Sequence, residues 1–67
     1  MTKAEAVRDF KDYVMPAIRE AYEADGVPDY VARSEEWNNF TDALCKSGEI
    51  TSKQYESWTH PAICGDN

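Results

Sequence analysis

The sequence predicts an all-α fold in which a long helix, kinked at a proline, packs on a short helix-turn-helix hairpin and self-associates. Three observations predict it. Apolar residues recur at steps of three and four. Capping-box motifs open helices at Thr2 and at Thr51, and glycines follow the ends of two helical stretches. The 67 residues form a single domain, with helices over 3–25, 35–47 and 52–59 and a loose tail over 60–67.

The first helix opens with Thr2 and Glu5, which have the T-x-x-E spacing of a capping box. A seam of apolar residues follows at helical spacing, made of Val7, Phe10, Val14, Ala17, Ala21 and Ala24. Arg19 and Glu23 are four residues apart, as in a helix-surface ion pair. Gly26 is expected to end the helix.

Pro16 lies inside this first helix. Its ring removes a backbone donor and clashes with the carbonyl of Asp12, so the helix either kinks or breaks there. The seam keeps its phase on both sides of the proline, which favours one continuous, kinked helix.

The second helix is expected to begin after Ser34, a plausible N-cap, while residues 30–34 are ambiguous. Its apolar stripe consists of Trp37, Phe40 and Leu44, and Gly48 closes it. The third helix begins with the capping box of Thr51 and Gln54 and ends before Pro61.

Composition narrows the class of function. Thirteen acidic against seven basic residues give a net charge of −6, which disfavours direct nucleic-acid binding and a basic membrane-surface helix. Mimicry of a phosphate backbone by the scattered acids stays open as a lesser alternative. No apolar stretch is long enough to cross a bilayer and no signal peptide is evident, so we expect a cytoplasmic protein.

The aliphatic content is low: one leucine, three isoleucines and four valines. Chains this short rarely bury enough apolar area to be stable alone, so we expect a homo-oligomer, with a dimer as the first expectation. The predicted interface is the seam on the first helix, at Val7, Phe10, Val14, Ala17 and Ala21.

Catalytic and metal chemistry have weak support. His60 and Cys64 are close in sequence but Pro61 separates them, and Cys45, His60, Cys64 and Asp42 do not have a recognised zinc spacing. We expect no catalytic residue, no metal and no cofactor. Two reduced thiols are expected, with a Cys45–Cys64 disulfide as the alternative.

The middle of the second helix carries polar residues that are mediocre helix formers, which indicates a role beyond helix stability. Either they make polar contacts across a helix or subunit interface, or they bind a ligand or partner with aromatic side chains as stacking surfaces. The candidate binding residues are Trp37, Asn38, Thr41, Asp42, Tyr55 and Trp58.

Residues 37–61 read WNNFTDALCKSGEITSKQYESWTHP, and this stretch resembles a segment of small proteins from tailed bacteriophages. The resemblance rests on 37–42, 44–46, 48–51, the Gln54-Tyr55 pair and Trp58, and it leaves the first helix unmatched. It implies a phage accessory protein in a bacterial cytoplasm, without any assigned functional residue.

Together these observations predict a non-enzymatic protein that binds and inhibits a host protein or a defence complex, in the anti-CRISPR and counter-defence class. One alternative is a protein that sequesters a nucleotide-like signal. Another is a structural or adaptor subunit.

Overall fold

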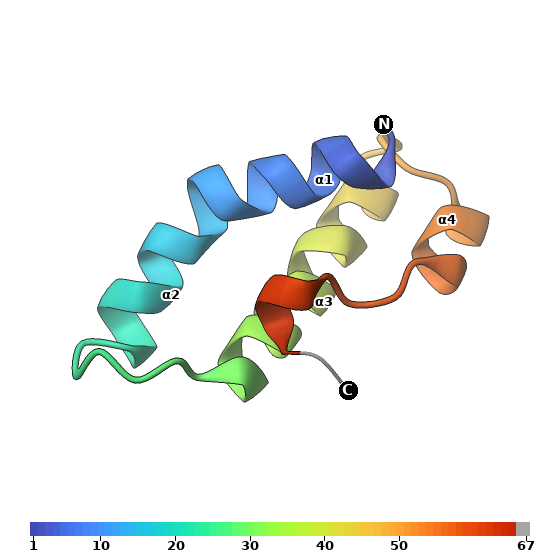
Figure 1. Ribbon diagram of the computed structural model, residues 1–67. Coiled ribbons are helices and arrows are strands. Elements are labelled where there is room, and N and C mark those ends of the chain that lie inside the picture. The colour runs from blue at the N-terminus through green and yellow to red at the C-terminus, as the bar shows by residue number, and fades with distance from the viewer. Residues whose placement is uncertain (66–67) are drawn as a thin grey trace.

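The computed structural model describes residues 1–65 and shows an all-helical chain with no strand in that range. The helical elements are α1 (Lys3–Asp9), the π-helical η1 (Phe10–Val14), α2 (Met15–Tyr22), α3 (Tyr30–Lys46), α4 (Ser52–Ser57) and the 3₁₀ turn η2 (Ala62–Cys64). Figure 1 shows α1 and α2 following one another along one side of the molecule, with α3 crossing beside them. The all-α part of the predicted fold class is confirmed, while the proline kink and self-association stay predictions.

α3 is the central element, because η1, α2, α4 and η2 all contact it. Its apolar stripe meets the first helical stretch in a cluster of three aromatic rings. Phe10 packs edge-on against Trp37 with ring centroids 5.3 Å apart, and Phe40 lies 5.8 Å from Phe10 and 6.0 Å from Trp37. Such pairs contribute about 0.5–1.5 kcal/mol each beyond the area they bury, so aromatic rings offset the shortage of leucine.

Both predicted capping boxes are present. The Thr2 hydroxyl accepts from the Glu5 N–H, and the Glu5 carboxylate accepts from the Thr2 N–H. The Thr2 N–H bond lowers the pKa of Glu5. Thr51 and Gln54 make the same reciprocal pair at α4. These bonds use residues three apart, which is why local sequence was sufficient to predict them.

The glycine that closes α3 is also as predicted, and the helix ends at Lys46, one residue before the expected 47. Gly48 has φ +82°, and the N–H groups of Gly48 and Glu49 donate to the carbonyls of Cys45 and Leu44. These two bonds form a Schellman motif, which satisfies carbonyls that would otherwise lack partners at the helix end.

The helical path continues through Pro16, but it changes type just before it. The N–H of Met15 donates to the carbonyl of Phe10, five residues earlier, so this hydrogen bond of η1 spans one residue more than that of an α-helix. Pro16 then falls in the first turn of α2, where a missing N–H is tolerated. A proline-induced kink stays a prediction.

This extra residue shifts the phase of the helix, and the prediction that the seam keeps its phase is wrong. The residues that the first helical stretch buries are Ala6, Phe10, Met15 and Ile18. Phe10 is fully enclosed in the core of a single chain, Val7 and Val14 are half-buried, and Ala17 and Ala21 are exposed. The five residues expected at a subunit interface therefore do not share one free face.

Three element boundaries differ by two or more residues from the expected ones. The first helical stretch ends at Tyr22 rather than residue 25, because Glu23 leaves helical geometry and turns its side chain inward. α3 begins at Tyr30 rather than residue 35, because Asp29 and not Ser34 is the N-cap, accepting from Ala32 N at 3.0 Å. α4 ends at Ser57 rather than residue 59, where Trp58 becomes extended and packs against the core.

The C-terminal tail is not loose over its described part. Residues 62–64 form η2, and Cys64 is buried in the core. Figure 1 shows this short turn lying against α3. Residues 66 and 67, also expected in the tail, lie outside the described part of the chain.

Candidate functional site

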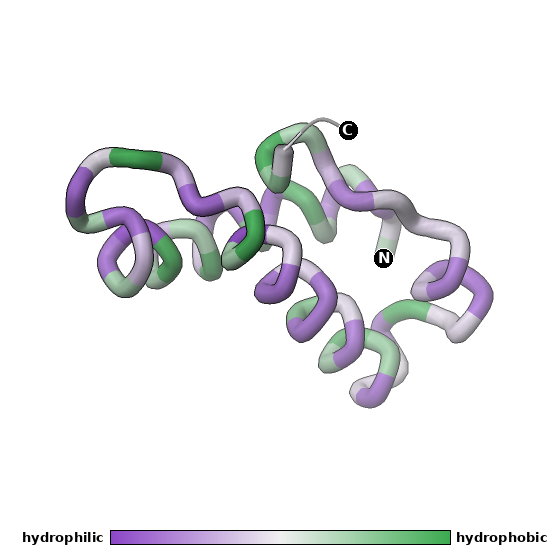
Figure 2. The backbone as a smooth tube through the Cα atoms, turned by 90° about the horizontal axis from the view of Figure 1, so that it is seen from below, coloured by the Kyte–Doolittle hydropathy of each residue, from purple (hydrophilic) through white to green (hydrophobic). Residues whose placement is uncertain are grey.

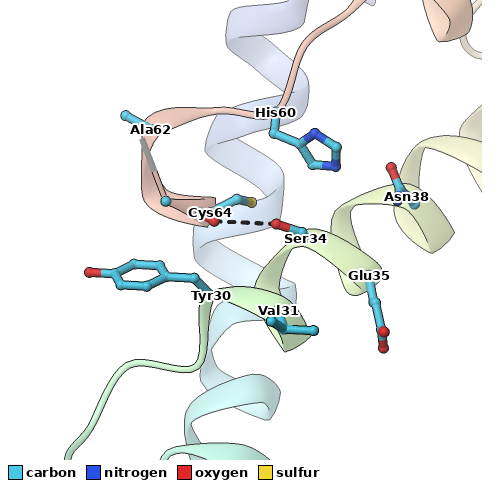
Figure 3. A pocket seen from close by; sticks show the side chains of 9 residues that line it. Tyr30, Val31, Ser34, Glu35, Asn38, His60, Ala62 and Cys64 are labelled. Carbon is cyan, nitrogen blue, oxygen red and sulfur yellow. Dashed lines mark hydrogen bonds between the residues drawn. The ribbon is translucent and has the colours of Figure 1, made fainter. Parts of the chain in front are cut away.

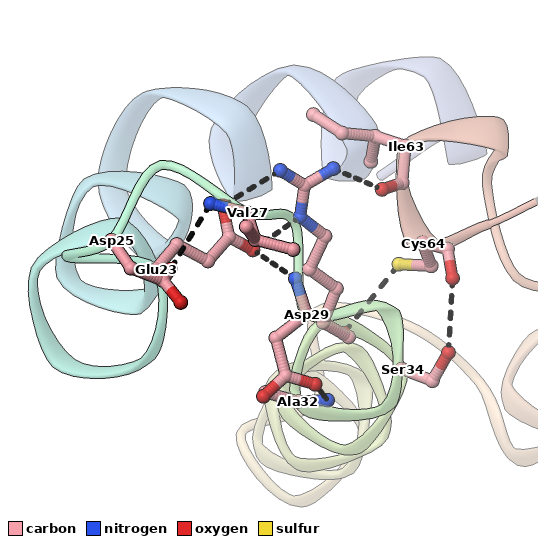
Figure 4. A network of polar contacts seen from close by, with 9 residues as sticks. Glu23, Asp25, Val27, Asp29, Ala32, Ser34, Ile63 and Cys64 are labelled. Carbon is pink, nitrogen blue, oxygen red and sulfur yellow. Dashed lines mark hydrogen bonds and ion pairs between the residues drawn. The ribbon is translucent and has the colours of Figure 1, made fainter.

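A network of polar contacts joins Glu23, which follows α2, to α3 and η2 through Arg33 (Figure 4). The Arg33 guanidinium donates to both carboxylate oxygens of Glu23, at 2.7 and 2.8 Å, and to the carbonyl of Ile63 at 2.9 Å. Asp29 N also donates to Glu23 at 3.0 Å. The charge pair has little contact with solvent, since the side chains are 11% and 6% exposed.

These contacts change the ionisation of both groups. Hydrogen bonds from Arg33 and from the Asp29 backbone lower the pKa of Glu23 to about 2, against the opposing effect of burial. The Glu23 carboxylate in turn raises the pKa of Arg33. Glu23 had been expected to pair with Arg19 four residues earlier, but its first partner is Arg33, ten residues later in the chain.

A second set of bonds holds the C-terminal segment on α3. The Ser34 hydroxyl donates to the carbonyl of Cys64 at 3.2 Å, and the Cys64 thiol donates to the carbonyl of Arg33 at 3.5 Å. Burial raises the pKa of the Cys64 thiol. Both side chains act as structural donors to backbone carbonyls.

Beside this network lies an open groove of ≈ 650 Å³ between the first half of α3 and the C-terminal segment (Figure 3). α3 provides one wall, with Tyr30, Val31, Ser34, Glu35 and Asn38. The C-terminal segment provides the other wall, with His60, Ala62, Cys64 and Gly65.

Tyr30 and Val31, which we call the ridge, also border a second hollow of ≈ 400 Å³ on the side of the α2–α3 connection. They are 49% and 69% exposed, although both are large apolar side chains. Tyr22 and Val27 line the second hollow and are exposed as well. Figure 2 shows hydrophobic colour in this connection, at the end of the molecule away from α4.

Within the ridge, Tyr30 packs against two other parts of the chain. The Arg33 guanidinium carbon lies 5.2 Å from the centroid of the Tyr30 ring, a cation–π contact. On another side, Gly65 approaches Tyr30 so closely that a Cβ placed there would lie 3.2 Å from the tyrosine Cβ. A tyrosine held in this way presents a preformed surface, which lowers the entropy lost when a partner binds.

The six predicted binding residues do not gather at this groove or at any other single surface. Two are buried: Trp37 is in the aromatic cluster, and the Thr41 hydroxyl donates to the carbonyls of Trp37 and Asn38. Of the six, Asn38 lines the groove.

The other three predicted binding residues are dispersed. Asp42 pairs with Lys46 at 2.9 Å, which raises the pKa of Lys46. Tyr55 is exposed on α4, and Trp58 is half-buried against the core. A continuous stacking platform made of Trp37, Tyr55 and Trp58 is therefore absent from the described structure.

In the described part of the chain, neither the metal site nor the Cys45–Cys64 disulfide considered above is formed. Cys45 and Cys64 are free thiols, and Cys45 lies 3.9 Å from the Ser52 hydroxyl. Within residues 1–65 no three His, Cys, Asp or Glu side chains are grouped to hold a metal ion.

Sequence reasoning missed the ridge because it left residues 30–34 unassigned. The available signal was Asp29, a strong N-cap residue just after Pro28, which would have started the helix at Tyr30 and placed Val31 in its first turn. The groove beside that turn also requires the C-terminal segment, whose position no local sequence pattern predicts.

No protein-family model, curated protein or solved structure is significantly similar to this chain. Among the described residues, no helix has the length and apolar character required to cross a membrane.

Proposed function

We propose that this chain is a non-enzymatic binding protein that attaches to a host protein or defence complex in a bacterial cytoplasm and inhibits it. The observation that carries the proposal is the ridge: two exposed apolar side chains bordered by two hollows, of which Tyr30 lies against the Arg33 guanidinium and Gly65. Tyr22 and Val27 line the second hollow with the ridge and are also exposed, and contiguous apolar surface of this kind marks protein interaction sites.

The nucleophile-type side chains of the groove favour binding over catalysis. The Ser34 hydroxyl and the Cys64 thiol both donate to backbone carbonyls, so neither is paired with a base. The raised pKa of Cys64 keeps its sulfur protonated, and the thiol is far less nucleophilic than the thiolate.

The resemblance of residues 37–61 to a segment of tailed-phage proteins supports the biological setting. Small acidic helical proteins of phages commonly act by occupying a functional surface of a host factor, as anti-CRISPR proteins do. By analogy of size and architecture, we therefore assign the exposed ridge to binding a host factor in counter-defence.

The second candidate function is sequestration of a nucleotide-like signal. The groove volume of ≈ 650 Å³ lies in the range of small-molecule sites, and Tyr30, Asn38 and His60 provide stacking and hydrogen-bonding groups. A nucleotide phosphate would, however, meet the Glu35 carboxylate in that groove, which makes this function second. A rise in melting temperature with a panel of nucleotides would support it.

An adaptor subunit that acts through self-association is the third candidate. The homodimer predicted through the first helix would need a face other than the one containing Phe10, since that ring is enclosed within one chain. Sedimentation over a range of concentrations measures the oligomeric state directly.

The test of the first proposal uses the tagged protein, its Val31→Ser variant and a Tyr13→Ser control, with bacterial host lysate. Tyr13 is 76% exposed on η1 and borders neither hollow. We expect wild type and the control to capture one host protein and to reduce its activity in a purified assay, and the Val31 variant to do neither. Equal capture by all three proteins, or capture without inhibition, would contradict the proposal.

A further inference from the structure

We infer that the ridge accepts a basic segment of its partner, in which lysine or arginine side chains flank an apolar side chain. The inference rests on the proposed function, since it takes the ridge as the binding surface, and it adds the chemistry of the occupant. Its basis is the charge around the ridge.

Carboxylates line both spaces beside the two exposed side chains, and one oxygen each of Asp25 and Asp29 accepts a backbone N–H. Glu35 lines the groove, and Asp25 and Asp29 line the second hollow. Among the residues described as lining these two spaces, none is lysine or arginine. Arg33 lies under the ridge, but its guanidinium is occupied by Glu23 and the Ile63 carbonyl.

The apolar part of the surface lies between two open spaces rather than on a flat face. The ridge separates the groove from the second hollow, so an apolar side chain can enter one of them while the neighbouring residues pass over the ridge. The cations of the same segment then lie near Glu35 on one side and near Asp25 on the other. Complementary charge of this kind speeds association and selects the partner.

The same charges argue against two other occupants. In a two-fold dimer through the ridge, each copy would bring its own Asp25, Asp29 and Glu35 against those of the other, and like charges at an interface are unfavourable. A nucleic-acid strand would bring phosphates to the same carboxylates. A basic protein segment is the occupant that these carboxylates favour.

The experiment uses three synthetic peptides of equal length, built from leucine with lysine, with glutamine or with glutamate. Binding to the full chain is measured by calorimetry, and the contact surface is mapped from amide chemical shifts in the ¹⁵N-labelled protein. We expect the leucine–lysine peptide to bind with a salt-sensitive affinity and to shift the resonances of Tyr30, Val31 and Glu35, and we expect no binding of the leucine–glutamate peptide.

Matched variants separate the surface from the general acidity of the protein. Glu35→Lys and Glu56→Lys change the net charge equally, but Glu56 lies on α4 and borders neither space. We expect Glu35→Lys to lower the affinity for the lysine peptide about tenfold and Glu56→Lys to change this affinity less than twofold. Val31→Ser should also lower the affinity for the lysine peptide, while Tyr13→Ser should not.

Several results would overturn the inference. One is an equal loss of affinity for the lysine peptide in the Glu35→Lys and Glu56→Lys variants, and another is amide chemical-shift changes that map away from the ridge. The others are equal binding of the lysine and glutamate peptides, and a dimer in which the ridge is the interface. The proposed function fails separately. A lysate target that is inhibited equally by the Val31→Ser variant contradicts the ridge as the inhibitory surface, whereas peptide binding at the ridge without any inhibited target contradicts the proposed function and supports the basic occupant alone.

Discussion

Replacing Phe10 by alanine tests whether this residue belongs to the core of one chain or to a seam between two. Its side chain is fully buried and packs against both Trp37 and Phe40. Removing a buried phenylalanine costs about 3–5 kcal/mol. A chain of this size has about 3–5 kcal/mol of stability in total, so the variant should be largely unfolded at 25 °C.

The assay is far-UV circular dichroism with urea and thermal melts at several protein concentrations. Phe10→Ala should lose its helical signal at every concentration, while Phe10→Leu should stay folded with a loss of about 1–2 kcal/mol. Ala17→Ser, at an exposed position of α2, serves as the control and should change stability by less than about 0.5 kcal/mol. A Phe10→Ala protein that remains helical as a dissociated monomer would refute the placement of Phe10 in the core of one chain.

Three further predictions follow from single contacts. Thr51→Ala removes the hydroxyl that accepts from Gln54 N and should lower the free energy of unfolding by about 1 kcal/mol, measured by urea titration; Thr51→Ser should restore most of the loss. Glu23 has a folded pKa of about 2 against an ordinary value of 4.5, so its stabilising effect is complete above pH 4.5 and is lost as the pH falls toward 2. Acid melts of wild type should therefore lose stability between pH 4.5 and 2 more steeply than those of Glu23→Gln, and equal slopes would contradict the ion pair with Arg33. Gly48→Ala forces a side chain into φ +82° and should cost about 1–2 kcal/mol in the same urea titration, whereas an unchanged midpoint would argue against the Schellman end of α3.

Where helices begin and end was predicted best at positions with a complete local motif. Thr2 with Glu5, and Thr51 with Gln54, satisfy each other across three residues, so their bonds exist whatever packs around them. Gly48 ends α3 for the same kind of reason. Ser34 is the counterexample. Serine is a common N-cap residue and predicts a helix start at this position, but Ser34 lies inside α3, whose N-cap is Asp29.

The candidate site was predicted poorly, because its parts come from distant segments. Asn38 was the one predicted binding residue that lines the groove, and Trp37 was expected to be a stacking surface although it is enclosed by Phe10 and Phe40. An aromatic residue can serve a core or a site with the same sequence pattern. The choice depends on what packs against it.

The sequence by itself determined that this chain is helical and where α1 and α4 begin, because capping and helical spacing depend on residues three or four apart. Tertiary structure decided the rest. The π turn before Pro16 moved the buried face from Ala17 to Met15 and Ile18, and burial made Arg33 rather than Arg19 the first partner of Glu23. Those outcomes depend on contacts between segments far apart in the chain, where burial sets the strength of each contact.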